Sequence, residues 1–109
     1  MAYSEELAER VRAILADRPD VVEKKMFGGL TFMLRGNMCC GIQQDGLMVR
    51  VGPEKYTEAL AQPHAHAMDL GGRPMRGMVK VALEGLALDA ALAAWVQQGV
   101  QFASSLPAK

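Results

Sequence analysis

The sequence has few of the residues that most often carry covalent or metal chemistry. Only two cysteines, Cys39 and Cys40, occur among the 109 residues, and the three serines, Ser4, Ser104 and Ser105, lie close to the two ends of the chain. Phosphate-binding loops of the forms GxGxxG and GxxxxGK[ST] are absent as well. No nucleophile with a neighbouring base can be nominated. We therefore expect a protein that is not an enzyme and that needs no metal or other cofactor.

Long apolar runs are also missing. No stretch approaches the ~20 apolar residues that span a bilayer. The first ten residues, MAYSEELAER, lack the basic start and apolar segment of a secretory signal peptide. We expect no membrane association and a cytoplasmic location, where cysteine thiols stay reduced.

Neither sign of charge dominates, because twelve basic and twelve acidic residues give a net charge of zero. Nucleic-acid binding needs an excess of Lys and Arg on at least one face of a protein, so direct binding is disfavoured. The charge is nevertheless uneven. Residues 1–23 hold six acidic and three basic side chains, whereas residues 24–80 hold eight basic and four acidic ones. A basic face that contacts nucleic acid therefore stays open as an alternative.

What is present suits one ordinary globular domain over residues 1–109. Half of the residues are apolar and 22% are charged, which is the balance of a chain that buries a core. The first segment predicts an amphipathic helix, with Ser4 as its N-cap and an apolar stripe of Leu7, Val11, Ile14 and Leu15.

From residue 24 the apolar period changes to two, which is typical of strands. Leu30, Phe32 and Leu34 share one face of such a strand, and the residues between them share the other. Three dipeptides have the composition of tight turns: Gly28-Gly29, Gly36-Asn37 and Asp45-Gly46. Residues 24–51 therefore predict a meander of four antiparallel strands.

The second half of the chain predicts two more helices around two more strands. Pro53 suits the first position of a short helix, and strands follow at residues 66–70 and 75–81, joined by a turn at Gly71-Gly72. Asp89 can cap a long last helix. The predicted order is α-β4-α-β2-α, and helices packed on one antiparallel sheet make a two-layer α+β sandwich.

Gly99 lies on the predicted buried stripe of the last helix. A glycine in a helix interior costs about 1 kcal/mol relative to alanine. A close approach between this helix and the sheet is the compensation that we expect.

Two pairs of residues raise the question of a reactive or metal site. Cys39 and Cys40 are adjacent on a predicted strand, so their side chains should point to opposite faces, one buried and one half-exposed, and should not chelate one metal ion. His64 and His66 lack a carboxylate cluster or an HExxH motif beside them. We interpret the cysteines as structural and the histidines as part of a solvated loop.

Methionine is abundant, with eight residues, and most of them fall in or beside predicted strands. Met serves both as core filler and on adaptable binding surfaces. If helices cover only one face of the sheet, Met33, Met48 and Met78 could line the other face and bind a protein partner or a second copy of the chain. The basic side chains nearby could contribute, or could be individually solvated charges. The candidate interaction surface comprises Lys25, Met33, Arg35, Met48, Arg50, Arg73, Arg76 and Lys80.

Three segments together resemble a known family. They are the Met26-Phe27-Gly28-Gly29 run before an apolar strand, the Gly36-Asn37-Met38 turn, and the stretch of residues 47–52 that reads LMVRVG. Residues 76–81, which read RGMVKV, and the last helix with Trp95 agree with the same pattern. The chain resembles the N-terminal domain of the competence regulator TfoX, also called Sxy, from about Ser4 to Leu106.

This resemblance implies a fold similar to a secretion-chaperone-like α+β sandwich, in which the Met26 to Gly29 run forms a structural hairpin. It implies no catalytic residue. The full-length regulator acts on transcription of DNA-uptake genes together with the cyclic-AMP receptor protein, so the resemblance implies a regulatory domain with a protein partner in the transcription machinery.

Two other functions stay open on the residues alone. A pocket between sheet and helices, near Cys39 and the loop of residues 64–76, could bind a small molecule or support an enzyme. Direct nucleic-acid binding through a basic sheet face is the other alternative, and its affinity should fall steeply with salt.

Overall fold

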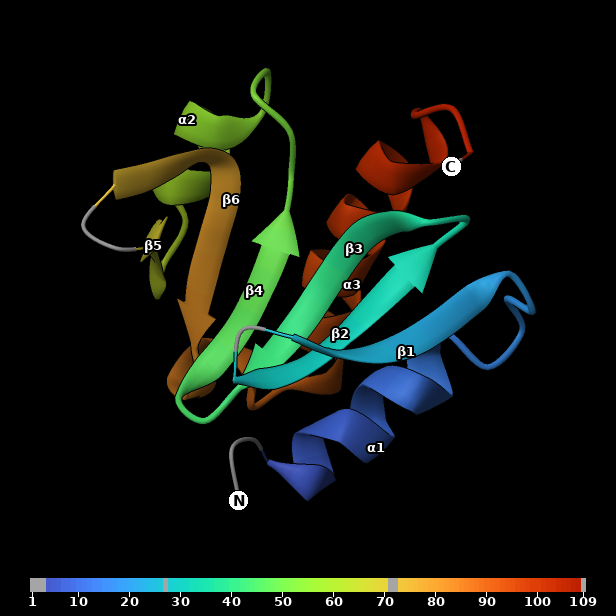
Figure 1. Cartoon of the computed structure of the whole chain (residues 1–109). Coiled ribbons are helices and arrows are strands. Elements are labelled where there is room, and N and C mark those ends of the chain that lie inside the picture. The colour runs from blue at the N-terminus through green and yellow to red at the C-terminus, as the bar shows by residue number, and fades with distance from the viewer. Residues whose placement is uncertain (1–3, 27, 71–72, 109) are drawn as a thin grey trace.

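A computed structural model describes residues 4–26, 28–70 and 73–108, apart from the side chains of residues 69, 70, 73 and 74. Within them the chain forms a six-stranded antiparallel sheet and three α helices (Figure 1), which confirms the α+β class. A 3₁₀ helix, which the sequence did not predict, precedes the last α helix. The elements in chain order are α1 Glu5–Ile14, β1 Val21–Met26, β2 Gly29–Leu34, β3 Asn37–Gln43, β4 Gly46–Arg50, α2 Tyr56–Leu60, β5 Ala65–Leu70, β6 Arg73–Ala82, the 3₁₀ helix η1 Leu83–Leu86 and α3 Asp89–Ser104.

The strands follow the order β1-β2-β3-β4-β6-β5 across the sheet. The first strand begins at Val21, so the predicted start at residue 24 is wrong. Val21 pairs with Leu34 and packs against the core, which extends the ladder of β1 and β2 by three residues. The alternation is obscured because four of the six residues of β1 are exposed and three of those four are charged.

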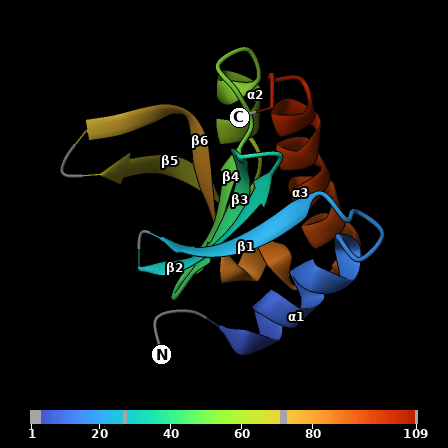
Figure 2. The ribbon, with the colours of Figure 1, turned by 45° about the vertical axis from the view of Figure 1, so that its right-hand side comes forward.

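Helices α1 and α3 lie on the same side of the sheet, and the far ends of β5 and β6 reach away from it on the other side (Figure 2). The main core fills the space between the sheet and these helices. It is built mostly of branched and aromatic side chains from the strands and the helices, with a few alanines and the two cysteines. The largest of its fully buried side chains are Phe32, Leu34, Ile42, Leu47, Leu86 and Leu92.

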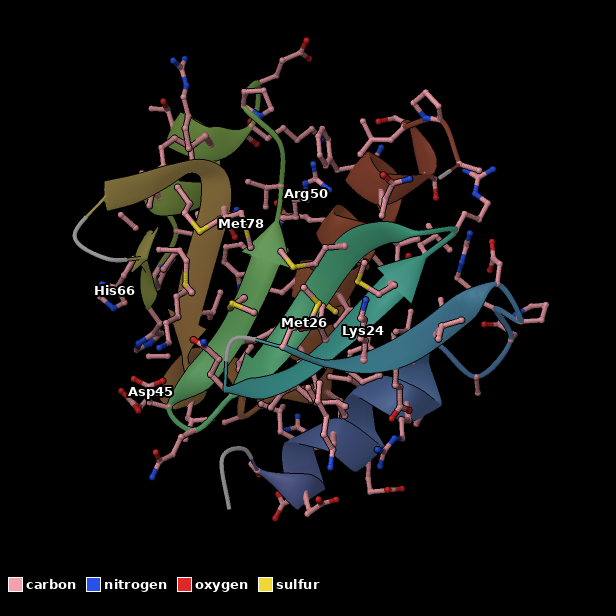
Figure 3. All side chains as sticks on the ribbon, in the orientation of Figure 1. Lys24, Met26, Asp45, Arg50, His66 and Met78 are labelled. Atoms are coloured by element: carbon pink, nitrogen blue, oxygen red, sulfur yellow. The ribbon has the colours of Figure 1, made fainter. Side chains whose placement is uncertain are left out.

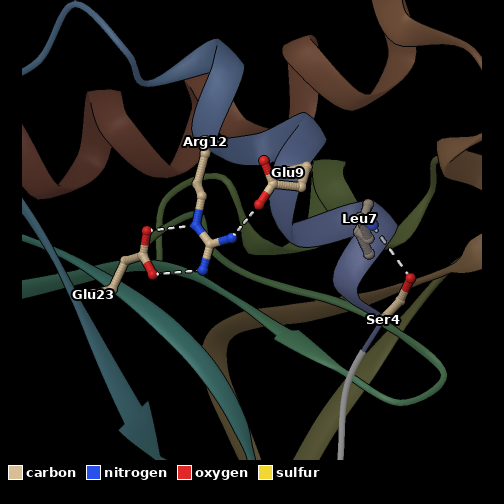
Figure 4. Close-up of polar contacts among 5 residues, drawn as sticks. All are labelled: Ser4, Leu7, Glu9, Arg12 and Glu23. Atoms are coloured by element: carbon tan, nitrogen blue, oxygen red, sulfur yellow. Dashed lines mark hydrogen bonds and ion pairs between the residues drawn. The ribbon is translucent and has the colours of Figure 1, made fainter. Parts of the chain in front are cut away.

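Side-chain hydrogen bonds cap the start of helix α1 and join the helix to the edge strand β1 (Figure 4). Ser4 is its N-cap, as predicted, and its hydroxyl accepts a hydrogen bond from the Leu7 amide at 3.2 Å. Arg12 donates to both carboxylate oxygens of Glu23 on β1, at 2.7 and 2.8 Å, and to Glu9 at 2.6 Å. The hydrogen bonds from Arg12 lower the pKa of the Glu23 carboxyl below its usual value.

Helix α3 approaches the sheet most closely at Gly99, as the sequence predicts. A Cβ atom at this position would overlap the carbonyl oxygen of Cys39 and would lie 3.2 Å from its Sγ. The approach is therefore between backbone and backbone, and it compensates for the poor helix propensity of glycine.

The predicted starts of the two later helices are wrong. Leu88 occupies the N-cap of α3 and provides no side-chain hydrogen bond, while Asp89 instead forms an ion pair with Arg10 of α1 at 3.0 Å. Pro53 lies in a turn, and α2 begins only at Tyr56. Gly52, with a φ of +88°, bends the chain out of the sheet at this point, so the helix begins later.

Strand β6 changes direction at Gly77, whose φ of +92° is a conformation that favours glycine. The Gly77 carbonyl accepts hydrogen bonds from the amides of Val51 at 2.9 Å and Gly52 at 3.0 Å. From Met78 to Ala82 the strand pairs with β4, whereas residues 73–76 extend beyond β4. We call residues 68–70 and 73–76 the β5–β6 arm. The turn predicted at Gly71-Gly72 lies outside the described residues.

Candidate functional site

The face of the sheet opposite the helices carries methionines from all six strands. Figure 3 looks onto this face, where Met26 and Met78 are labelled and further sulfur atoms spread over the neighbouring strands. Strand register places Met33 opposite Met38, and Met48 in the row that contains Thr31 and Gly41. We call this surface the methionine face, and its methionines are Met26, Met33, Met38, Met48, Met68, Met75 and Met78.

These methionines are not equally exposed. Met48, Met68 and Met78 are buried and form a second small core, separate from the one under the helices, and Met38 and Met75 pack against it. Met26 and Met33 are half-buried, and Val22 beside them on β1 is 63% exposed. Both interpretations of the methionines therefore hold in part, because some are core filler and others line a surface.

One row of residues crosses the middle of this face from strand to strand. Lys24, Thr31, Gly41, Met48 and Lys80 are cross-strand neighbours in that order. A Cβ atom built on Gly41 would lie 2.6 Å from the terminal methyl carbon of Met48 and 3.3 Å from the Thr31 hydroxyl oxygen. The end of the Met48 side chain thus fills the space that a larger residue at Gly41 would need.

The Thr31 hydroxyl is fully buried and makes no hydrogen bond to any of the described residues. A buried hydroxyl without a partner is unfavourable by about 1–3 kcal/mol. It is one of only two such unsatisfied side-chain atoms in the part of the chain that the structure describes.

Only some of the predicted basic residues whose side chains the structure describes lie on this face. Lys80 lies on it and forms an ion pair with Asp45 at 2.6 Å. Arg35 donates to the carbonyl of Ser104 at the end of α3, at 3.0 Å, and the guanidinium of Arg50 lies 5.3 Å from the centre of the Phe102 ring.

The remaining predicted basic residues are also dispersed. Lys25 pairs with Leu30, so register places it on the helix side, and it is its neighbour Lys24 that lies on the methionine face. Arg76 is exposed on the β5–β6 arm. The Arg73 side chain lies outside the described residues. Among the described residues of the predicted interaction surface, register therefore places Met33, Met48, Arg50 and Lys80 on the methionine face.

The Met26 to Gly29 run joins β1 to β2. Gly28 has a φ of +73°, and a Cβ atom at Gly29 would overlap the carbonyl oxygen of Ile42 on β3. Both glycines are therefore required by the local backbone. Phe27 lies outside the described residues.

The two cysteines do not point to opposite faces, and that prediction is wrong. The register of β2 and β3 shifts between Phe32 and Met33, so that an extra residue stands in β3 at the position of Cys39. Both side chains are consequently buried in the main core, where the thiols form a hydrogen bond with each other.

This environment disfavours a reactive thiolate. The hydrogen bond with Cys39 and complete burial raise the pKa of the Cys40 thiol well above its usual value. Among the described residues, no three His, Cys, Asp or Glu side chains gather closely enough to hold a metal ion. His64 and His66 are both exposed.

A pocket of about 400 Å³ lies between the chain that leaves β4 and the last turns of α3. It is lined by Val51, Gly52, Pro53, Glu54, Lys55, Gln98, Gln101, Phe102 and Ser105. Its position differs from the one predicted near Cys39, because buried side chains fill the interface of sheet and helices there.

The family model described as the TfoX N-terminal domain matches residues 13–103. The chain belongs to the TfoX N-terminal domain family. In this TfoX-family chain the matched region contains the whole sheet, most of α3 and only the last two residues of α1. Searches of curated proteins and of solved structures found no match.

None of the described helices of this family member is both long and apolar enough to cross a membrane. Its sequence did not single out Thr31, Gly41 or Val22 as site residues. The period of two placed Thr31 on the second face, but its contact with Gly41 and Met48 depends on cross-strand register, which the turns between strands determine.

Proposed function

We propose that this TfoX-family domain is not an enzyme but a regulatory domain that binds a protein partner through the methionine face. The observation that carries the proposal is the set of half-buried and exposed apolar side chains on that face, Val22, Met26, Met33, Met38 and Met75, which no helix covers. Flexible thioether side chains adapt to the shape of a partner at little energetic cost. Family membership supports a regulatory role.

The partner that we propose belongs to the transcription machinery, and the process is competence or a related transcriptional response. The resemblance to the competence regulator supports this choice. We place the role in the cytoplasm, where such a partner is accessible. A second copy of the chain is the other protein that this face could bind.

Direct nucleic-acid binding is less well supported. Affinity for phosphates requires several cations on one surface. Three of the basic residues considered for it, Arg35, Arg50 and Lys80, already contact a helix end, an aromatic ring and a carboxylate.

Affinity capture tests the proposed function. The tagged chain is incubated with a lysate of its own source, with and without nuclease, and compared with Val22→Glu and Leu88→Glu variants. Val22 and Leu88 are exposed to similar extents, 63% and 73%, but only Val22 lies on the methionine face. We expect nuclease-resistant partners that Val22→Glu loses and Leu88→Glu keeps.

Other outcomes of this capture contradict the proposal. Partners that disappear with nuclease indicate nucleic-acid binding. Partners that both variants retain indicate that a different surface binds them. If no partner is captured even at low salt, the proposed protein interaction is contradicted. Light scattering at high concentration, on wild type and Val22→Glu, tests whether a second copy occupies the face.

Small-molecule binding is a second candidate, favoured by the pocket beside Phe102. Side-chain amides from Gln98 and Gln101, the Lys55 ammonium group and an aromatic ring all line it. A ligand screen by thermal shift, repeated on Gln101→Trp to fill the pocket, tests this candidate. Compounds that stabilise wild type and Gln101→Trp equally would show that they do not bind in this pocket.

A further inference from the structure

We propose that the point where Met48 covers Gly41 is the anchor site for the partner. There, a tyrosine side chain of an acidic protein segment displaces the end of Met48 and hydrogen-bonds to Thr31. This inference rests on the proposed function and identifies which part of the methionine face recognises the partner and by what chemistry.

The first observation is the fit of Met48 over Gly41. The space above Gly41 is taken by the terminal methyl group of a flexible side chain, 2.6 Å from the Cβ position. A rotation about the Met48 side-chain bonds moves this group without disturbing the backbone. Such a rotation opens a space over the sheet, bounded by Gly41 and Thr31.

The second observation is the state of Thr31. Its hydroxyl is buried and unpartnered among the described residues, although it lies 3.3 Å from the same Cβ position on Gly41. A partner group that enters this space can donate to, or accept from, that hydroxyl. Binding then supplies the hydrogen bond that the free domain lacks.

The charges beside the site indicate the sign of the partner. Lys24 flanks Thr31 on one side and Lys80 flanks Met48 on the other. Lys80 is already paired with Asp45, whereas Lys24 is exposed and makes no ion pair with any residue that the structure describes. A carboxylate next to the anchor, on the side of β1, complements Lys24.

Tyrosine is the anchor that best satisfies these conditions. Its ring makes favourable contacts with thioether sulfur, and its hydroxyl can reach a polar group at the base of an apolar site. The apolar surface continues from the site over Met33 and Val22 on the neighbouring positions of β2 and β1, so an extended segment can contact both the site and this surface. We therefore assign the site to a protein segment.

A phage-displayed library of random peptides provides the probe. Selection on the immobilised wild-type domain should enrich sequences with a tyrosine, adjacent apolar residues and at least one Asp or Glu. A synthetic peptide of the enriched sequence, and the same peptide with Tyr replaced by Phe, are then titrated against variants by fluorescence anisotropy.

The variants separate the anchor from the rest of the face. Thr31→Val keeps the shape and removes the hydroxyl, and we expect it to weaken peptide binding about tenfold. The Phe peptide should bind wild type about tenfold more weakly and should lose nothing further on Thr31→Val. Lys24→Glu should weaken binding, whereas the control Lys25→Glu, the next residue but on the opposite face, should not.

Equal losses for the Tyr-to-Phe change on wild type and on Thr31→Val would falsify the hydrogen bond. Enriched basic peptides, peptides that bind Lys24→Glu as well as wild type, or no enrichment at all overturn the site as stated. Melting curves of each variant establish that it is folded.

The natural partner distinguishes this inference from the proposed function. If a captured protein is lost on Val22→Glu but binds Thr31→Val with unchanged affinity, the methionine face is the interface and the anchor at Thr31 is wrong. If neither substitution weakens binding of the captured protein, the proposed function itself is contradicted.

Discussion

The two faces of one sheet are built from different kinds of apolar residue. Under α1 and α3, adjacent strands contribute Leu, Ile, Val and Phe, whose few rotamers favour a single packing arrangement. On the opposite face the apolar residues are mainly methionines, and only part of them are buried. The core that must adopt a single packing arrangement is thus built from side chains with few rotamers. The face that must adapt to a partner carries flexible side chains.

The largest effect should come from Phe32, which lies next to Met33 on β2 but points to the opposite face. Phe32→Ala should lower the free energy of unfolding by about 3–5 kcal/mol, because it leaves a cavity in the main core. Met33→Ala should cost about 1 kcal/mol or less, since that side chain is half-exposed. Urea titration measures both. Similar losses would mean that the two faces contribute alike to stability.

Two glycines sharpen the comparison. Gly99→Ala places a Cβ against the backbone of Cys39, which cannot move without shifting a strand, so we expect a net loss of about 1–3 kcal/mol. Gly41→Ala meets the movable end of Met48 at 2.6 Å and the Thr31 hydroxyl oxygen at 3.3 Å, and it should cost about 1 kcal/mol or less. Thermal melts of both variants provide the measurement. A larger loss for Gly41→Ala than for Gly99→Ala would contradict the assigned difference in rigidity.

A smaller effect, dependent on pH, is expected at the edge where α1 meets β1. The Arg12 hydrogen bonds hold the pKa of Glu23 below its usual value, so the ion pair stabilises the fold above about pH 4.3. Glu23→Gln should be less stable than wild type at pH 7. This difference should shrink as the pH falls through 4.3, roughly the pKa of glutamate in the unfolded chain, and should vanish once Glu23 is protonated in the folded chain too.

Urea titrations of wild type and Glu23→Gln between pH 7 and pH 2 measure this dependence. Glu9→Gln, which removes the other carboxylate that Arg12 contacts, is the matched control. A stability difference for Glu23→Gln that stays constant over the whole range would exclude the ion pair as its source.

The smallest effect should be a gain. Thr31→Val removes a buried hydroxyl that has no described partner, so the free energy of unfolding should rise by up to about 1 kcal/mol. Differential scanning calorimetry measures the change. A clear loss of stability would show that Thr31 makes a hydrogen bond in the free domain, and the anchor site would lose its main support.

Most of the fold could be predicted because the apolar periods are local. The apolar stripe of α1, the alternation of β2 and the place of Gly99 on the buried stripe of α3 are all patterns of residues close together in the chain. The placement of Cys39 could not be predicted, since a bulge changes the face of a side chain without changing the sequence pattern.

The candidate site was predicted less completely than the fold. Met33 and Met48 were placed on the second face by alternation alone. The directions of Arg35 and Arg50 depend on Ser104 and Phe102 of α3, each of which lies more than fifty positions later in the sequence. Long flexible side chains choose their partners from the tertiary structure, so no local pattern shows whether such a charge is available.

The bend at Gly77 divides β6 into two parts that should differ in amide hydrogen exchange. Residues 79–81 have strands on both sides, β4 and β5, so their amides should exchange only when the whole domain unfolds. Residues 73–76 lie beyond the end of β4, and the arm that contains them can open while the remaining sheet stays closed. A single strand thus connects the most and the least protected parts of the sheet, and the arm that carries Met75 can adjust without loss of the fold.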